Sequence, residues 1–161
     1  MLVARFKMES IIFSRFIDCL LYTSQSPNNA ERDDIGYSSA WLHHKGRNRH
    51  HYEYWIDYST RGIKGGMAPV AMPRKYVVEM LMDRIAASKT YRGSAYTDQD
   101  PLDYYKSAKE PPMLHPKTKA QLEKLLTMLA EEGEEKTFAY VRSVVLKKGR
   151  RKAGTKQGKG A

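Results

Sequence analysis

The chain has 161 residues, enough for one domain with a buried core but not for two independent ones. Its formal net charge is +10, but residues 147–161 carry seven Lys and Arg and no acid, so the rest, with 21 basic and 18 acidic residues, is only +3. A tail of this composition attracts nucleic acid without any evolved recognition site. The single cysteine, Cys19, excludes an intramolecular disulfide framework and an all-cysteine zinc site, and favours a cytoplasmic protein.

Residues 1–24 admit two interpretations. The sequence from Cys19 to Ser24 reads CLLYTS, the translation of a transposon end used to prepare sequencing libraries, which predicts that residues 1–24 are an assembly junction. Residues 8–22 also fit an amphipathic helix. The apolar run over residues 11–22 contains two charges and is shorter than the ~20 residues that a bilayer-spanning helix needs, so we expect no membrane segment.

Two short helices are predicted between residues 25 and 48. The first ends at Gly36, and the second carries Trp41 and the first two histidines until Gly46 and Asn48 weaken or end it. Their capping residues are Asn28 or Asn29 and Ser38 or Ser39. We expect the helix to resume over residues 50–58, and the Gly-, Pro- and Met-rich residues 59–72 to form a loop.

The strongest helix signal covers residues 75–89, which contain no helix breaker and follow Pro73. On a helical wheel of ~100° per residue, the apolar residues fill one broad face. They are Val77, Val78, Leu81, Met82 and Ile85. Tyr76, Glu79, Asp83 and Ala86 gather on another face, and the alanine there allows another helix to approach closely.

The C-terminal third is predicted to hold two more helices after a loop over residues 91–112. The first opens at Pro116, is capped by His115 and has leucines spaced i, i+3, i+4 and i+7 until Gly133 stops it. These are Leu122, Leu125, Leu126 and Leu129. The second, over residues 135–148, packs through Phe138, Val141, Val144 and Val145.

These elements predict an all-α fold, a compact bundle of about five helices with a long Gly/Pro/Met loop. Residues 25–146 would form a single helical domain, and residues 147–161 a disordered basic tail. No internal repeat and no strand hairpin are predicted.

Four of the five histidines fall within nine residues, as His43, His44, His50 and His51. Imidazole is the commonest neutral nitrogen ligand for transition metals, and a carboxylate often completes such sites. Asp83 is a polar residue on an otherwise apolar helix and is the carboxylate that we expect to face the cluster. The pattern predicts a site for a divalent Fe, Mn, Zn or Mg ion.

The spacing of these histidines constrains the site. His43 and His50, or His44 and His51, are seven residues apart, which on an unbroken helix places them ~10.5 Å apart along the axis. One ion cannot bridge that distance, so either the chain turns near residues 46–48, where Gly46 supplies conformational freedom, or two ions are bound. The spacing leaves open which member of each pair points inward.

Less specific interpretations remain beside the metal site. The histidines could be exposed helix residues beside a basic strip of Lys45, Arg47 and Arg49, or could serve packing. Glu53 and Glu79 are candidates to accept the second N–H of a ligating imidazole, or are solvent-facing acids. Asp83 could instead form a structural ion pair with Arg84 or with a base of the tail. Near the end of the helix, Lys89, Tyr91 and Arg92 would suit an anionic substrate or an ordinary exposed turn.

The sequence resembles a known family at the residues that carry these features. Residues 37–55, YSSAWLHHKGRNRHHYEYW, followed by Met72-Pro73, Glu79-Met80, Asp83-Arg84 and residues 87–91, are similar to the uncharacterised bacterial family named domain of unknown function 5662. The resemblance covers residues 26–145 and implies no established activity. Family members carry a His-Asp pair further upstream, and this chain has no histidine before His43.

The order of histidines and a late aspartate also resembles the HD-type metal-dependent phosphohydrolases, although their His-Asp pair has no counterpart here. This similarity implies a hydrolase in which a metal ion polarises a phosphoryl oxygen of a phosphorylated small molecule or nucleotide. Lys45, Arg47, Asn48 and Lys89 would hold the phosphate. The alternative is a non-enzymatic helical protein that binds nucleic acid through its basic tail. No nucleophile elbow, phosphate-binding glycine loop or dinucleotide fingerprint indicates another chemistry.

Overall fold

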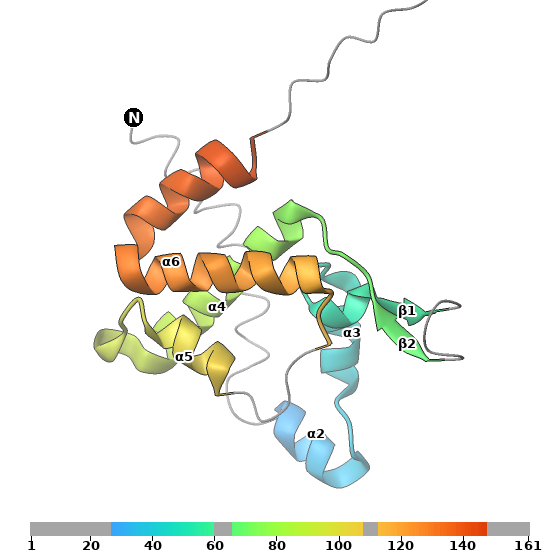
Figure 1. The fold of residues 1–161 in the computed structure, drawn as a ribbon. Coiled ribbons are helices and arrows are strands. Elements are labelled where there is room, and N and C mark those ends of the chain that lie inside the picture. The colour runs from blue at the N-terminus through green and yellow to red at the C-terminus, as the bar shows by residue number, and fades with distance from the viewer. Residues whose placement is uncertain (1–26, 60–65, 108–112, 148–161) are drawn as a thin grey trace, which may run out of the picture.

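The computed structural model describes residues 27–59, 66–107 and 113–147, and these are mostly helical (Figure 1). The helices are α2 (Pro27–Ile35), α3 (Ser39–Arg47), α4 (Arg74–Arg92), α5 (Asp100–Lys106) and α6 (Pro116–Tyr140). Single 3-10 turns occupy Tyr52–Trp55 and Gly93–Ala95, and a π-helical turn, Val141–Val145, follows α6. None of the described helices is both long and apolar enough to cross a membrane.

The hydrophobic core lies where α4 and α6 pack against each other, with α5 against α6 (Figure 1). The predicted apolar stripes of both long helices face this core: Val77 and Leu81 on α4 and Leu122 and Leu126 on α6 are fully buried. Their burial removes large aliphatic side chains from water, which is the main favourable contribution to folding. Helix α4 therefore presents its other face, which carries Asp83, toward α3 and the segment that follows it.

Several predicted helix boundaries are confirmed. Helix α2 ends before Gly36, which has a φ of 83°. The Ser38 hydroxyl accepts a hydrogen bond from the Trp41 amide (3.1 Å) and caps α3, and the His115 ring accepts one from the Lys117 amide (3.1 Å) and caps α6. The assigned bounds of α6 run past Gly133, but its non-helical φ of 83° and ψ of 170° divide the helix at the predicted position.

The all-α prediction is wrong in one element, a small antiparallel hairpin. Strand β1 (Ile56–Tyr58) pairs with β2 (Met67–Pro69), with Ile56 opposite Pro69. Residues 50–58 do not resume a helix beyond one 3-10 turn, and part of the predicted 59–72 loop is strand. Three residues per strand are too few for the alternation of apolar and polar side chains that identifies a strand.

Two further predictions in the C-terminal half are corrected. Residues 91–112 are not simply a loop, because α4 continues to Arg92 and α5 begins at Asp100, with Pro101 in its first turn and Leu102 buried in the core. The last predicted helix becomes a π-helical turn at Val141, which rotates Val144 to the surface while Val141 and Val145 stay buried. The predictions for residues 1–24 and for nearly all of the basic tail lie outside the described residues.

Candidate metal centre

Helix α3 selects one histidine of the first pair. The Ser38 cap fixes where α3 begins, and from that start His44 falls on the inner face, with 6% of its surface exposed. His43, one residue earlier and 100° away around the helix, faces solvent. The first pair therefore contributes a single buried imidazole.

The chain turns immediately after α3 and brings the second pair of histidines back. The helix ends at Arg47, and Asn48 adopts an extended conformation whose backbone N–H still donates to the His44 carbonyl (3.1 Å). The Asn48 side-chain nitrogen donates to the same carbonyl (2.9 Å) and lies 3.1 Å from His44 Nδ1. The turn that the spacing demanded is present, but it lies at Asn48, while Gly46 remains helical.

Three imidazoles converge as a result. His44, His50 and His51 each offer a ring nitrogen, and these three atoms all lie within 4.8 Å of one another. Nitrogen ligands on one tetrahedral zinc ion lie about 3.4 Å apart, given Zn–N bonds of about 2.1 Å, so small side-chain rotations suffice to bind one ion. The Trp41 ring packs against both His44 and His51, at centroid distances of 5.6 and 5.1 Å, and limits their movement.

Burial keeps the second histidine pair in the form that binds metal. It lowers the pKa of His51 to about 3, and the neighbouring His50 and His44 add to this effect. Burial also lowers the pKa of His50, against the opposing effect of the Asp83 charge. Nε2 of His50 and of His51 is buried without a hydrogen-bond partner among the described residues. Both rings are therefore neutral at pH 7 and retain an unused buried nitrogen, as a transition-metal ligand requires.

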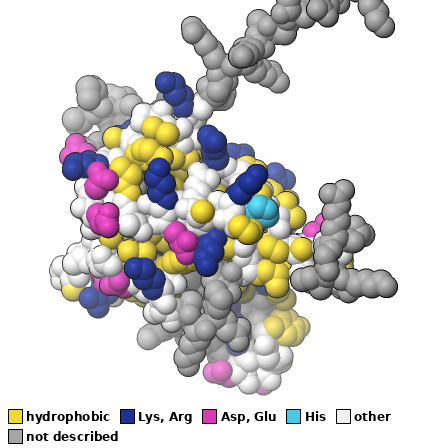
Figure 2. All heavy atoms as spheres, viewed as in Figure 1, with side chains coloured by type: hydrophobic (Ala, Val, Ile, Leu, Met, Phe, Trp, Pro, Cys, Tyr) yellow, Lys and Arg dark blue, Asp and Glu magenta, His cyan; other side chains and the backbone are white. Residues whose placement is uncertain are grey.

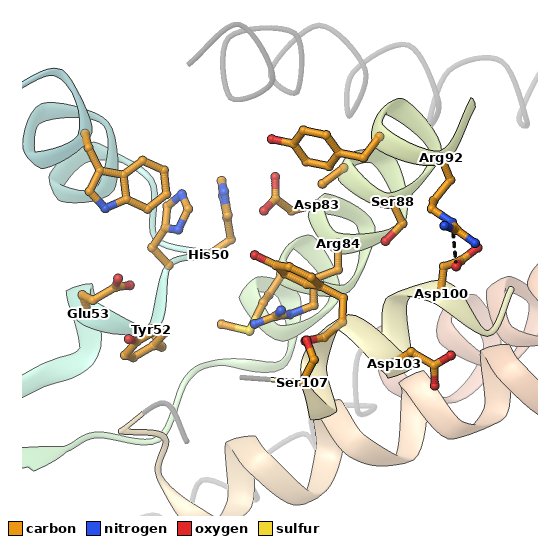
Figure 3. A pocket seen from close by; sticks show the side chains of 16 residues that line it. His50, Tyr52, Glu53, Asp83, Arg84, Ser88, Arg92, Asp100, Asp103 and Ser107 are labelled. Atoms are coloured by element: carbon orange, nitrogen blue, oxygen red, sulfur yellow. Dashed lines mark hydrogen bonds and ion pairs between the residues drawn. The ribbon is translucent and has the colours of Figure 1, made fainter. Parts of the chain in front are cut away.

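Two residues of the cluster, His50 and His51, line a pocket of about 600 Å³ between the segment after α3, helix α4 and helix α5 (Figure 3). His50, His51 and Glu53 line one side, and Asp83 and Arg84 project into the pocket from α4. Asp83 acts electrostatically on His50, but its carboxylate is not among the atoms that lie within 4.8 Å of one another. Asp83 thus lines the same pocket as His50 and His51, but it is not one of the residues whose ligand atoms converge.

The family model described as "Family of unknown function (DUF5662)" matches residues 14–128, more than two thirds of the chain. The chain belongs to this family. No curated protein and no solved structure matches it. The similarity to HD-type phosphohydrolases therefore gains no support from these comparisons, and any activity of this DUF5662 protein has to be argued from the site.

The residues predicted to support the site in this DUF5662 chain lie at different distances from it. Glu53 lines the pocket, and its Oε2 is buried without a hydrogen-bond partner among the described residues, whereas Glu79 does not line the pocket. Lys45 is half-buried on α3 and close enough to His51 to lower its pKa, and Arg47 is exposed. Asn48 contacts His44 directly.

Lys89, the fourth predicted phosphate ligand, is engaged away from the pocket. Its ammonium group lies 2.5 Å from the Glu134 carboxylate and 5.1 Å from the centre of the Tyr96 ring. It is absent from the pocket lining. The end of α4 turns it toward α6, which the sequence spacing could not indicate.

Sequence reasoning missed several polar residues of the pocket, namely Arg84, Ser88 and Tyr104. Arg92, which the sequence offered together with Lys89 and Tyr91 for an anionic substrate, also lines the pocket and pairs with Asp100 at 3.1 Å. Arg84 follows Asp83 directly and was considered only as its structural ion-pair partner. Figure 2 shows that cationic side chains are spread over the visible face, so basic residues by themselves did not point to this pocket.

Proposed function

We propose that this chain is a metal-dependent hydrolase that acts on the phosphate ester of a small molecule. The observation that carries the proposal is the convergence of His44, His50 and His51, two of which, His50 and His51, line a pocket. A structural zinc site is closed by four protein ligands, whereas a catalytic site has three and leaves a position for water or substrate. Three imidazoles beside an open cavity fit the second arrangement.

The donor set narrows the predicted metals. Imidazole nitrogen suits zinc and iron, whereas magnesium prefers oxygen ligands and retains its water. Of the four ions considered from the sequence, zinc and iron therefore fit the three histidines best. A bound ion of this kind would polarise a phosphoryl oxygen and lower the pKa of a water molecule toward neutrality.

The side chains around the cluster supply the remaining chemistry. Asp83 faces the histidines and is placed to accept a proton from the attacking water and return it to the leaving oxygen as the phosphorus–oxygen ester bond breaks. Glu53, whose Oε2 is buried without a hydrogen-bond partner among the described residues, is the acid that we propose accepts a hydrogen bond from the second N–H of a ligating imidazole. Trp41 holds two of the rings against rotation. This chemistry is that of the HD-type enzymes, without their His-Asp pair.

The test is metal content together with hydrolysis. The full chain is purified, loaded separately with zinc, iron and manganese, analysed for bound metal and assayed with p-nitrophenyl phosphate. We expect one ion per chain in the native protein and in His43→Ala, and none in the double variant His44→Ala plus His50→Ala. The absence of stoichiometric metal in the native chain would overturn the metal site. Stoichiometric metal without hydrolysis of phosphate monoesters or diesters would overturn the hydrolase.

A further inference from the structure

Arg84 is a cation inside the pocket whose hydrogen bonds are incomplete. Its side chain leaves α4 beside Asp83 and projects into the cavity that His50 lines (Figure 3). The guanidinium lies 5.4 Å from the centre of the Tyr105 ring, a cation–π contact. Its Nε is buried with no hydrogen-bond partner among the described residues. A buried polar donor without a partner is costly, so the position of Arg84 calls for an explanation.

The groups around Arg84 compensate its charge only in part. Burial lowers the pKa of Arg84, and the opposing contributions come first from the Asp83 carboxylate and then from nearby tyrosines, Tyr104 and Tyr105 first among them. Arg92, in the same pocket, is paired directly with Asp100. If the Asp83 carboxylate acts at the histidine cluster, it does not fully compensate the charge of Arg84. A guanidinium remains charged and presents five N–H donors, so Arg84 then needs a further anion.

The position of Arg84 next to the histidines determines which anion it would meet. Arg84 lines the same pocket as His50 and His51, and its charge contributes to lowering the pKa of His51. An oxyanion between the two could take hydrogen bonds from the planar guanidinium and coordinate an ion held by the histidines. The fork of a guanidinium matches two oxygens of a phosphoryl group. The basic residues singled out from the sequence are less suitable, since Arg47 is exposed and Lys89 pairs with Glu134.

We propose that Arg84 binds the phosphoryl group of the substrate, and that the pocket recognises phosphorylated molecules through this residue. The inference deepens the proposed function and rests on it for the metal side of the site. Anion binding by Arg84 itself does not require the metal, so the two ideas can fail separately.

The experiment measures the binding of inorganic phosphate to the full chain by calorimetry, with and without loaded zinc. The variants are Arg84→Gln, Arg84→Lys and, as a control on the same helix but outside the pocket, Lys89→Gln. We expect Arg84→Gln to weaken phosphate binding about 10- to 100-fold, in line with the loss of charge-assisted hydrogen bonds. Arg84→Lys, which keeps the charge but not the fork, should lie in between, and Lys89→Gln should bind as the native chain does. Zinc content should be the same in all.

The outcomes separate the two proposals. A native chain that binds no zinc but binds phosphate through Arg84 would refute the metal site and leave the inference standing. Equal phosphate affinity in the native chain, Arg84→Gln and Arg84→Lys would overturn the inference while the metal site stands, as would a larger loss in Lys89→Gln. Circular dichroism identifies a misfolded variant, and if Arg84→Gln is misfolded, Arg84→Lys decides the question.

Discussion

Replacing His51 with alanine tests the proposed metal centre, because a neighbouring histidine provides a matched control. His51 offers one of the three converging nitrogens, and its Nε2 is buried. His43 lies on α3 next to His44 but faces solvent and belongs to no such group. If the three imidazoles bind an ion, His51→Ala should lower metal affinity strongly and His43→Ala should not change it.

The expected size of the effect follows from the number of ligands. Binding of zinc to a four-ligand site in a small protein releases about 10–16 kcal/mol, which is roughly 2.5–4 kcal/mol per ligand. Since each factor of ten in affinity is about 1.4 kcal/mol, loss of one imidazole should weaken zinc binding by roughly 100- to 1000-fold. A water molecule replacing the lost ligand would bring the effect toward the lower end of this range.

The assay is competition for zinc between the protein and a chromogenic chelator at pH 7.5, with circular dichroism to establish that each variant is folded. A loss below about threefold in a folded His51→Ala chain would refute the idea that this nitrogen is a ligand. A loss in His43→Ala as large as that in His51→Ala would show that zinc binds to surface histidines instead. Both measurements need only micromolar protein and no knowledge of the substrate.

Three further predictions concern stability. Burial lowers the pKa of His51 from 6.5 to about 3, so the neutral ring stabilises the folded state above pH 6.5, and this stabilisation is lost as pH falls toward 3. We therefore expect that, in urea denaturation of the metal-free protein, the free energy of unfolding falls by roughly 2–5 kcal/mol more in the native chain than in His51→Ala between pH 6.5 and pH 3. Identical pH profiles of the two proteins would contradict this prediction. Gly133→Ala should lower the free energy of unfolding by about 1–3 kcal/mol in the same assay. Gly133 has a φ of 83° and a ψ of 170°, and an added Cβ would lie 3.3 Å from the Asp98 carboxylate. An unchanged denaturation midpoint would refute this prediction. Leu126→Ala should lower the free energy of unfolding by about 2–5 kcal/mol, because Leu126 is fully buried. Val144→Ala, at an exposed position, should change it by less than about 0.5 kcal/mol. Equal effects of the two substitutions would argue against the described core.

The long elements of the fold could be predicted from sequence because many residues contribute to each signal. The stripe that includes Val77 and Leu81 and the spaced leucines of α6 each extend over several helical turns, and all of these residues except the partly buried Met82 are buried. Gly133 interrupts the second pattern where its φ requires a glycine. The β1–β2 hairpin and α5 are too short for periodicity to appear, and their formation depends on pairing or on packing against α6.

The sequence could locate the candidate site along the chain, but it could not predict which side chains converge there. The density of histidines between residues 43 and 51 pointed to the segment, and the axial distance required a turn within it. The choice of His44 over His43 depends on how α3 packs, which spacing alone does not determine. Arg84 was missed because an arginine next to an aspartate in the sequence suggests an ion pair. Only the packing of α4 and α5 shows that Arg84 lines the pocket and contacts the Tyr105 ring.

The hydrogen bonds of Asn48 determine how His44 can take part in the site. The Asn48 amide nitrogen donates to the His44 carbonyl and lies 3.1 Å from Nδ1, so in this orientation Nδ1 accepts and the ring proton resides on Nε2. Coordination by His44 through Nε2 therefore requires the proton to move to Nδ1 and the amide to turn so that its oxygen accepts it.

Asn48→Asp should remove this obstacle. A carboxylate accepts the Nδ1–H bond in either rotamer and favours the tautomer that coordinates through Nε2, so we expect zinc affinity at pH 7.5 to rise about tenfold. The His44 carbonyl keeps the backbone N–H of residue 48 as a donor, so the end of α3 should survive the change. Asn48→Ala is the control, since it removes the competing amide without supplying an acceptor and should gain less. A lower affinity in Asn48→Asp than in the native chain would mean that His44 coordinates through Nδ1, the nitrogen that the carboxylate would hold protonated.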